Sequence, residues 1–279
     1  MTPPPMNRRQ ALGAFGAVSL TGLLAACSSG DETAGSVTTT DGATATVETK
    51  TTTTAATKLT AAQFDSAATC RVATELTEGP YYFDVDAIRS DIREDREGTL
   101  LRLGVRVREA AGCEPIENAI VDVWHCDALG IYSGFEAASN GGGAVSSSRA
   151  DDKTYLRGAQ ATNSDGIVEF KTIYPGWYRG RTTHIHAKVH LDKATLLTTQ
   201  FFTTKAMDDV VFARQPYSEA DGRDTFNESD GIYAASGELT LSRDGGDVIG
   251  LITLDIERGW PPAAAVRNEG GGSSASQLS

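Results

Sequence analysis

The sequence lacks an excess of basic charge, and it holds few histidines and few cysteines. Its 279 residues include 25 Lys and Arg against 37 Asp and Glu, which gives a formal net charge of -12. A nucleic-acid partner requires clustered Lys and Arg, so the acidic balance argues against nucleic acid as a partner. Only four histidines are present. A close pair of histidines in such a chain is therefore informative.

The apolar run nearest the start, residues 11–26, is short for a membrane span. At about 16 residues it falls below the roughly 20 that a helix needs to cross a bilayer, and it fits the core of a signal peptide. Arg8 and Arg9 precede the run and resemble a twin-arginine export signal. We therefore expect residues 1–26 to be a signal peptide. The alternative is an ordinary N-terminal membrane helix.

Composition divides the rest of the chain. The run ends in Leu-Ala-Ala-Cys, which resembles a bacterial lipoprotein cleavage box and predicts lipidation at Cys27. We expect the lipid to anchor the exported protein to the outer face of the cell membrane. Residues 27–60 are rich in Thr and Ser and predict a flexible tether, whereas residues 263–279 predict a disordered tail. Residues 61–262 suffice for one domain with a single core.

Three cysteines remain beyond the lipidation site. An exported protein can form a disulfide, and three thiols allow one bridge with one cysteine left over. Cys113 and Cys126 flank one predicted strand, so pairing them with each other is awkward. Cys70 can pair with either. The sequence leaves both pairings open, and it is compatible with a homodimer without fixing the oligomeric state.

The pattern of the domain is that of an all-β protein. From Leu101 to Val107, apolar residues alternate with polar ones, which is the period of a half-buried strand. Further strands are predicted at 119–124, 167–173, 183–191 and 248–256, with a turn at 163–166. Residues 61–68 look helical, and residues 202–236 are typical of a long loop region with a helical turn. We expect a β-sandwich core with long loops and little helix.

Two of the four histidines stand two residues apart, at His184 and His186. Side chains two apart on a strand share a face, roughly 6.6 Å apart along it, so both imidazoles can reach one metal ion. A polar strand face that happens to hold two histidines is the alternative. Tyr178 lies six residues earlier, and Tyr132 lies on a turn that leaves another strand. Phenolate is a hard anionic donor, so two phenols favour Fe(III) over Zn(II).

Three blocks of sequence carry a family resemblance. Residues 78–82 (EGPYY), 121–134 (VDVWHCDALGIYSG) and 172–186 (TIYPGWYRGRTTHIH) resemble the intradiol ring-cleavage dioxygenases, which include catechol 1,2-dioxygenase and protocatechuate 3,4-dioxygenase. The resemblance extends over about residues 70–257. It implies a mononuclear, non-haem Fe(III) enzyme that uses O2 to cleave a catechol-type aromatic diol between its two hydroxyls. The implied product is a muconate-type diacid.

The resemblance also implies roles for individual residues. Four of them match the family's iron ligands: Tyr132, Tyr178, His184 and His186. Tyr132 resembles the tyrosinate that stays on the metal, and Tyr178 resembles the one that leaves when substrate binds. Arg181 and Gln200 match the family's active-site arginine and glutamine, while Pro80 and Tyr81 lie in the segment that lines the substrate pocket. Arg181 is also expected to contact substrate.

The loop between Tyr178 and His184 departs from the family pattern. It is much shorter than in the intracellular enzymes and resembles an exported branch of the family, so the choice of substrate does not carry over. Three other polar residues are expected outside the metal site. His125 is predicted to be buried, His190 to be peripheral, and Asp127 to cap the turn before Gly130.

Two other classes of function remain as alternatives. The first is a non-catalytic exported β-sandwich that serves as a binding module, which would not need an intact set of ligands. The second is a divalent-metal hydrolase that uses the two histidines. A hydrolase of this kind requires a carboxylate ligand, and the residues beside His184 and His186 supply none.

Overall fold

The computed structural model describes residues 58–64, 70–85, 87–139, 149–192 and 194–257, together with the backbone of two short strands nearer the N-terminus. The chain divides into two units, residues 1–56 and 57–279. In the first unit, β1 (Gly35–Thr38) pairs antiparallel with β2 (Thr44–Val47). The predicted signal peptide, Cys27 and the predicted tail lie outside the described residues. The tether remains a prediction.

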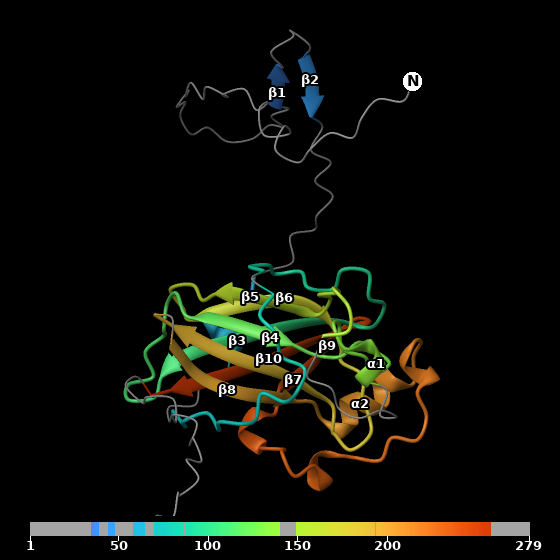
Figure 1. The fold of residues 1–279 in the computed structure, drawn as a ribbon. Coiled ribbons are helices and arrows are strands. Elements are labelled where there is room, and N and C mark those ends of the chain that lie inside the picture. Colours follow the sequence, from blue (N-terminus) through green and yellow to red (C-terminus); the bar gives the residue numbers. More distant parts are fainter. Residues whose placement is uncertain are drawn as a thin grey trace, which may run out of the picture. The chain divides into compact units, whose positions relative to one another are not determined.

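The second unit is built on two four-stranded sheets (Figure 1). The first sheet has the order β6-β3-β10-β9, and its strands are β3 (Leu100–Glu109), β6 (Ile167–Ile173), β9 (Thr240–Asp244) and β10 (Asp247–Ile256). The second, here called the site sheet, has the order β5-β4-β7-β8, and its strands are β4 (Ile120–Trp124), β5 (Arg157–Ala161), β7 (His184–Leu191) and β8 (Ala194–Phe202). The predicted all-β sandwich is confirmed.

Alternation along β3 shows why the two sheets stack. Leu101, Leu103, Val105 and Val107 are fully buried in the core between the sheets, and each contributes roughly 1.5–3 kcal/mol by leaving water. Arg102, Arg106 and Arg108 alternate with these residues and take the other face of the strand. β3 pairs with β10 in parallel, whereas the pairs within the site sheet are antiparallel.

The predicted turn at 163–166 is present, and it passes from one sheet to the other. It follows β5 of the site sheet and leads into β6 of the first sheet. The Asn163 side-chain oxygen accepts the backbone N–H groups of Asp165 and Ile167. Gly166 has a φ of +75°, and a Cβ there would lie 2.3 Å from the Val107 carbonyl oxygen, so only glycine fits.

Helix is sparse in the described residues. The stretch predicted as helical at 61–68 contains the 3-10 turn η1 (Ala61–Gln63), and residues 65–69 lie outside the described part. Residues 203–239, here called the cover segment, contain one helix, α2 (Lys205–Phe212), and three 3-10 turns, η2 (Tyr217–Glu219), η3 (Asn227–Ser229) and η4 (Ala235–Gly237). A further helical turn is α1 (Glu136–Ser139). None of the helices in these ranges is long and apolar enough to cross a membrane.

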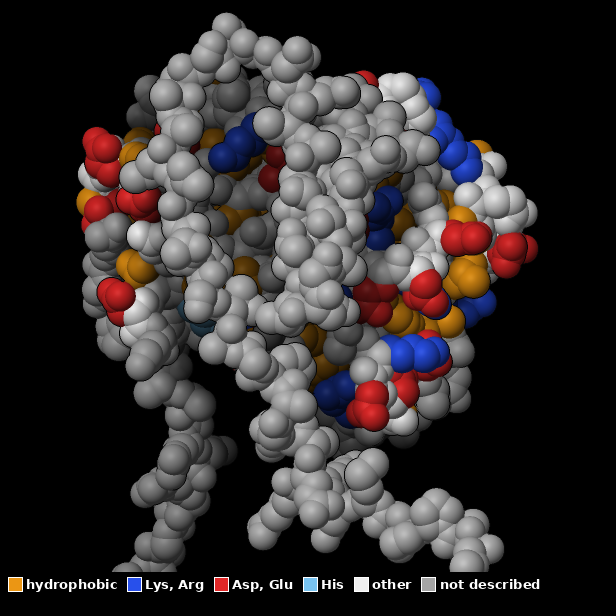
Figure 2. Space-filling view, turned by 90° about the horizontal axis from the view of Figure 1, so that it is seen from above, with side chains coloured by type: hydrophobic (Ala, Val, Ile, Leu, Met, Phe, Trp, Pro, Cys, Tyr) orange, Lys and Arg blue, Asp and Glu red, His pale blue; other side chains and the backbone are white. Residues whose placement is uncertain are grey.

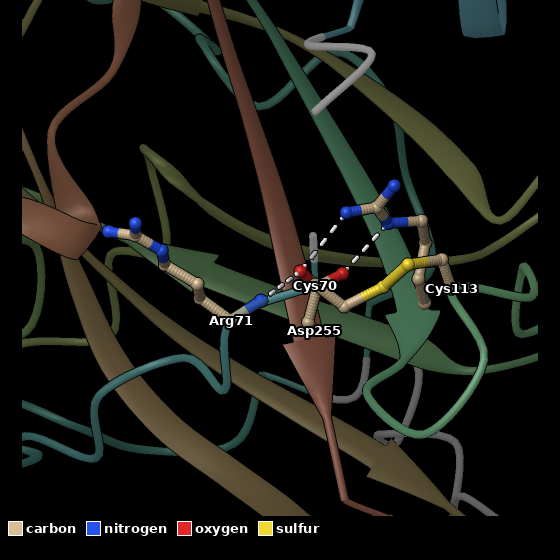
Figure 3. Close-up of a disulfide and its surroundings, with 5 residues drawn as sticks. Cys70, Arg71, Cys113 and Asp255 are labelled. Carbon is tan, nitrogen blue, oxygen red and sulfur yellow. Dashed lines mark hydrogen bonds and ion pairs between the residues drawn. A yellow bond between two sulfur atoms is a disulfide. The ribbon is translucent and has the colours of Figure 1, made fainter. Parts of the chain in front are cut away.

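A disulfide joins Cys70 to Cys113, which is one of the two pairings that the sequence left open (Figure 3). Cys126 is free and buried. Beside the disulfide, Asp255 on β10 forms a two-pronged ion pair with Arg108, at 2.7 and 3.0 Å, and accepts the backbone N–H of Arg71 at 2.9 Å. Figure 3 shows the Arg71 guanidinium turned away from this carboxylate. The disulfide and Asp255 together fix the start of the segment that leads to the site.

Candidate functional site

The two histidines of β7 lie side by side on one face of the site sheet, as predicted. His184 and His186 are each 2% exposed, and their Nε2 atoms are 3.1 Å apart. Between them, Ile185 faces the core. Trp124 on the neighbouring strand stacks on the His186 ring at 4.9 Å between centroids. The strand period and this stacking therefore hold both imidazoles at one point on the sheet.

Two tyrosines reach the same point from separate loops. The Tyr178 hydroxyl lies 3.1 Å from His184 Nε2, and the Tyr132 hydroxyl lies 3.4 Å from the same atom. Gly130 allows the two loops to touch, because a Cβ there would lie 2.5 Å from the Trp177 carbonyl oxygen. Four side chains thus converge, here called the quartet: Tyr132, Tyr178, His184 and His186.

Hydrogen bonding fixes the orientation of one imidazole. His184 Nδ1 lies 2.6 Å from the Thr182 carbonyl oxygen, which can only accept, so Nδ1 carries the proton. The lone pair of Nε2 then faces the other members of the quartet. Burial, followed by the charge of Arg181, lowers the pKa of His184 to about 3, and burial lowers that of His186 well below its usual value. Both imidazoles are therefore neutral, which is the form that binds metal.

The quartet fits a small, hard cation. Burial raises the pKa of both Tyr132 and Tyr178, so a positive charge at the centre is what would favour their phenolates. His186 Nδ1 is buried with no hydrogen-bond partner in the structure. Within the described ranges, no group of three or more His, Cys, Asp or Glu side chains is placed to hold a metal. The hydroxyls of Tyr132 and Tyr178 therefore complete a set of four donors with the two imidazoles.

Arg181 and Gln200 both reach this centre. Arg181 Nη1 lies 3.4 Å from His184 Nε2, and its Nη2 donates to Gln200 Oε1 at 2.6 Å. Gln200 is fully buried and stands opposite His186 in the β7–β8 register. The guanidinium therefore presents positive charge at the edge of the quartet while a neighbouring strand holds it in place.

Residues 70–82, here called the site strap, form one wall of the site. Tyr81 is buried, and its ring packs on Tyr132 at 4.9 Å and on Phe135 at 5.1 Å. Pro80, predicted to contact substrate, is exposed beside it. Gly79, which sequence reasoning missed, has a φ of +75°, and a Cβ there would lie 3.2 Å from His186. Glycine therefore allows the strap to pass directly over the imidazole.

The residues predicted to lie outside the metal site do so. His125 is 1% exposed and bonds through its ring nitrogens to the Cys126 carbonyl oxygen and the Thr172 hydroxyl. Asp127 accepts the backbone N–H groups of Leu129 and Ile131, as a turn cap does. His190 is partly buried at the far end of β7, where it meets Thr195.

Charged side chains of both signs share the described part of the face that Figure 2 shows. On the described part of the face in Figure 2, Lys and Arg side chains are interspersed with Asp and Glu. The mixture agrees with the net charge of -12. Binding to a phosphate backbone requires clustered basic residues instead.

Comparisons with known proteins agree on one family. The family described as Dioxygenase matches residues 77–218, which include the whole quartet. Catechol 1,2-dioxygenase 1 of Acinetobacter lwoffii is 31% identical over 147 residues, covering 44% of each chain. Chlorocatechol 1,2-dioxygenase of Rhodococcus opacus is 28% identical over 149 residues, covering 47% of this chain and 50% of the relative. The chain thus spans about half the length of these curated relatives.

A solved structure resembles most of the second unit. The intradiol ring-cleavage dioxygenase of Tetranychus urticae is 32% identical, with a TM-score of 0.65. The match covers 70% of this chain and 98% of that one. The similarity therefore extends over nearly the whole of that chain.

Proposed function

The chain belongs to the intradiol ring-cleavage dioxygenases, and from this premise we propose that its quartet holds one ferric ion and that it cleaves a catechol-type ring between the two hydroxyls. The co-substrate is O2, and the product is a muconate-type diacid. The convergence of two phenols and two neutral imidazoles on one point carries this proposal. When bound, Fe(III) supplies Lewis-acid activation of the diol and a template for its reaction with O2.

The two tyrosines differ in burial in a way that supports different roles. Tyr132 is fully buried and its ring packs against Tyr81, so it has little room to move. Tyr178 is only partly buried. Tyr178 is thus the phenol with room to swing aside when substrate enters, and its oxygen takes up a proton from one of the substrate hydroxyls.

Arg181 and the strap complete the substrate side of the site. The guanidinium at the edge of the quartet stabilises negative charge that develops on the ring during the reaction. Gln200 holds the guanidinium at that edge. Pro80 and Tyr81 contact the ring of the substrate. Relatives named for catechol and for chlorocatechol support a simple ortho-diol as the substrate class.

The alternative of a divalent-metal hydrolase lacks its carboxylate ligand. Such a site needs Asp, Glu or Cys beside the two histidines, and no group of this kind exists among the described residues. The binding-module alternative predicts that the protein holds no iron. Metal analysis separates all three functions.

We also propose that the protein is exported and held at the outer face of the cell membrane by a lipid on Cys27. The Cys70–Cys113 disulfide supports an oxidising compartment. Replacing Arg8 and Arg9 with Lys tests the twin-arginine route, since export should then fail. Replacing Cys27 with Ala should release the protein from membranes, and a Cys27→Ala variant that still sediments with membranes would contradict lipid anchoring.

The deciding experiment is a visible absorption spectrum of the purified protein before and after addition of catechol without O2. A tyrosinate-to-iron charge-transfer band that shifts on catechol addition is the expected result. Admission of O2 should then yield the muconate-type diacid. A protein that stays colourless after reconstitution with ferric iron would contradict the proposed function.

A further inference from the structure

Behind Arg181 stands a buried carboxylate that belongs to the cover segment. The Asp230 side chain is 2% exposed, and its Oδ2 accepts from Arg181 Nε at 2.8 Å. The same oxygen accepts the backbone N–H of Thr182 at 2.9 Å, and Oδ1 accepts that of Ile232 at 2.8 Å. Burial alone would raise the pKa of Asp230, but these N–H groups and the guanidinium together lower it. The group is therefore a fully bonded carboxylate ion.

Oδ2 of Asp230 is linked to the quartet through two chains of hydrogen bonds. The first runs through Arg181, whose other guanidinium nitrogens contact His184 Nε2 and Gln200. The second runs through Thr182, whose backbone N–H binds Asp230 and whose carbonyl holds His184 Nδ1–H. Both routes end on the same imidazole, one at each of its nitrogens.

A second side chain of the cover segment holds Thr182 from another direction. Asn227 Oδ1 accepts the Thr182 hydroxyl at 2.6 Å, while its amide nitrogen donates to the Thr203 carbonyl oxygen at 2.9 Å. The loop before β7 is thus fixed at Thr182 by two residues that lie more than 40 positions away in the chain. A loop held so rigidly gives His184 one ring orientation.

We infer that Asp230 is a positioning residue, which aligns Arg181 with the reacting ring and, through the Thr182 carbonyl, keeps the proton of His184 on Nδ1. This inference rests on the proposed function and deepens it. Asp230→Asn removes the charge and one of the two acceptor oxygens, so Arg181 Nε and the two backbone N–H groups can no longer all be satisfied and both the guanidinium and the loop lose their fixed geometry. Outer partners of this type typically change activity or metal affinity by 10–100-fold.

The structure provides a matched control in Asp255. It is a comparably buried carboxylate that also pairs with one arginine, Arg108, and one backbone N–H, that of Arg71 (Figure 3). Asp255 lies on β10 of the other sheet, and its side chain bonds to Arg108 and to the start of the strap at Arg71, not to any member of the quartet. Asp230→Asn and Asp255→Asn therefore remove similar charges, and only the first removes direct contacts with Arg181 and Thr182.

Two measurements test the inference. In steady-state assays with catechol on the iron-loaded protein, Asp230→Asn should lower kcat by roughly 10–100-fold with little change in KM. In metal-free protein labelled with ¹⁵N-histidine, the wild type should show His184 protonated at Nδ1, and Asp230→Asn should show a mixture of tautomers. Asp255→Asn should show neither change. Asp230→Glu, which restores the carboxylate, should recover part of the lost kcat.

Two results would overturn the inference. One is a wild-type kcat and a wild-type His184 signal in Asp230→Asn, and the other is an equal loss in Asp255→Asn. Should Asp230→Asn not fold, Asp230→Glu decides alone. A folded Asp230→Glu protein with the wild-type kcat and with His184 protonated at Nδ1 supports the role of the carboxylate. A folded Asp230→Glu protein with a kcat lowered by roughly 10–100-fold and a mixture of His184 tautomers contradicts it. If the wild-type protein binds no iron and shows no turnover, the proposed function is contradicted instead. The role of Asp230 is then tested by the tautomer measurement on the metal-free protein.

Discussion

At the scale of single residues, the site depends on which of its two tyrosines can move. Tyr178 is partly buried and Tyr132 is fully buried. Tyr178→Phe removes a phenolate and the acceptor for a substrate proton, so kcat/KM for catechol should fall by about 100-fold or more. Steady-state oxygen uptake measures this change. Tyr233→Phe, at a phenol bonded to Glu238 outside the quartet, is the control and should keep wild-type turnover.

Unchanged oxygen uptake in Tyr178→Phe would exclude Tyr178 from the reaction. The same variant should also alter the charge-transfer band, because one of two phenolate ligands is missing. A band identical to that of the wild type would remove Tyr178 from the coordination sphere as well.

A second prediction at this scale concerns the buried carboxyl group of Asp122 on β4. Burial raises its pKa from 3.8 to about 6, against a hydrogen bond from Tyr82 that lowers it. The folded state therefore binds a proton more tightly than the unfolded chain. This stabilisation is complete below pH 3.8 and is lost as the pH rises through 6, so the ionised carboxyl group leaves the fold about 3 kcal/mol less stable at neutral pH than the protonated group does at low pH.

Asp122→Asn should remove this pH dependence. Relative to wild type, the variant should gain unfolding free energy steadily between about pH 4 and pH 6 and then remain constant. Urea titrations at several pH values measure the difference. A difference that stays flat across this pH range would show that the pKa of Asp122 is not raised in the folded protein.

At the scale of elements, the site strap connects the disulfide to the quartet. It bonds in turn to β10 through Ala73 and to β8 through Leu76, and Gln200 donates to its Thr77 carbonyl oxygen. The strap thus spans an edge of the sandwich before Gly79 crosses His186. Both ends of this path are fixed, one by covalent bonding and one by packing.

Loss of the Cys70–Cys113 bridge should destabilise the domain. The bridge spans 43 residues, a separation for which chain entropy predicts a stabilisation of about 4 kcal/mol, and 2–4 kcal/mol is typical. The Cys70→Ala/Cys113→Ala variant should unfold at lower urea concentration by a corresponding amount. Reductant should lower the midpoint of the wild type and leave that of the variant unchanged. Equal midpoints for oxidised and reduced wild type would contradict this prediction.

Alternation of apolar and polar residues predicted β3 well. β3 alternates cleanly because its outer face carries arginines, and its predicted boundaries hold to within a few residues. β8 was missed, since Gln200, Phe201 and Phe202 are all buried. One face of that strand meets the core and the other meets the site, so alternation disappears. The apolar pattern of α2 is likewise too short to distinguish it from a loop.

The sequence predicted the four side chains that converge in the quartet, but it did not predict Asp230, which supports them from the cover segment. His184 and His186 stand two residues apart in one strand, and the blocks around the tyrosines are distinctive in sequence. The sequence around Asp230 carries no comparable motif. Asp230 lies 49 positions from Arg181, in a segment without periodicity. Contacts of this kind depend on how the cover segment folds over the sheet, and local sequence does not encode that path.

At the scale of the whole domain, the core and the quartet are separate sets of residues. The cluster between the sheets includes Leu103, Val105 and Ile185, and it contains no member of the quartet. The quartet lies on the other face of the site sheet, against the strap and loops. The described fold therefore has an apolar core that does not require a metal ion for its formation.

Removal of iron should accordingly abolish colour and activity while the fold persists. Bound ligand stabilises by about 2.7 kcal/mol at one hundred times its dissociation constant, which corresponds to a Tm shift of roughly 5–10 °C for a domain of this size. The far-UV circular dichroism of the metal-free protein should retain the strand spectrum, and added Fe(III) should restore the visible band and the higher Tm. A metal-free protein that has lost its strand spectrum would show that the quartet, rather than the core between the sheets, holds the domain together.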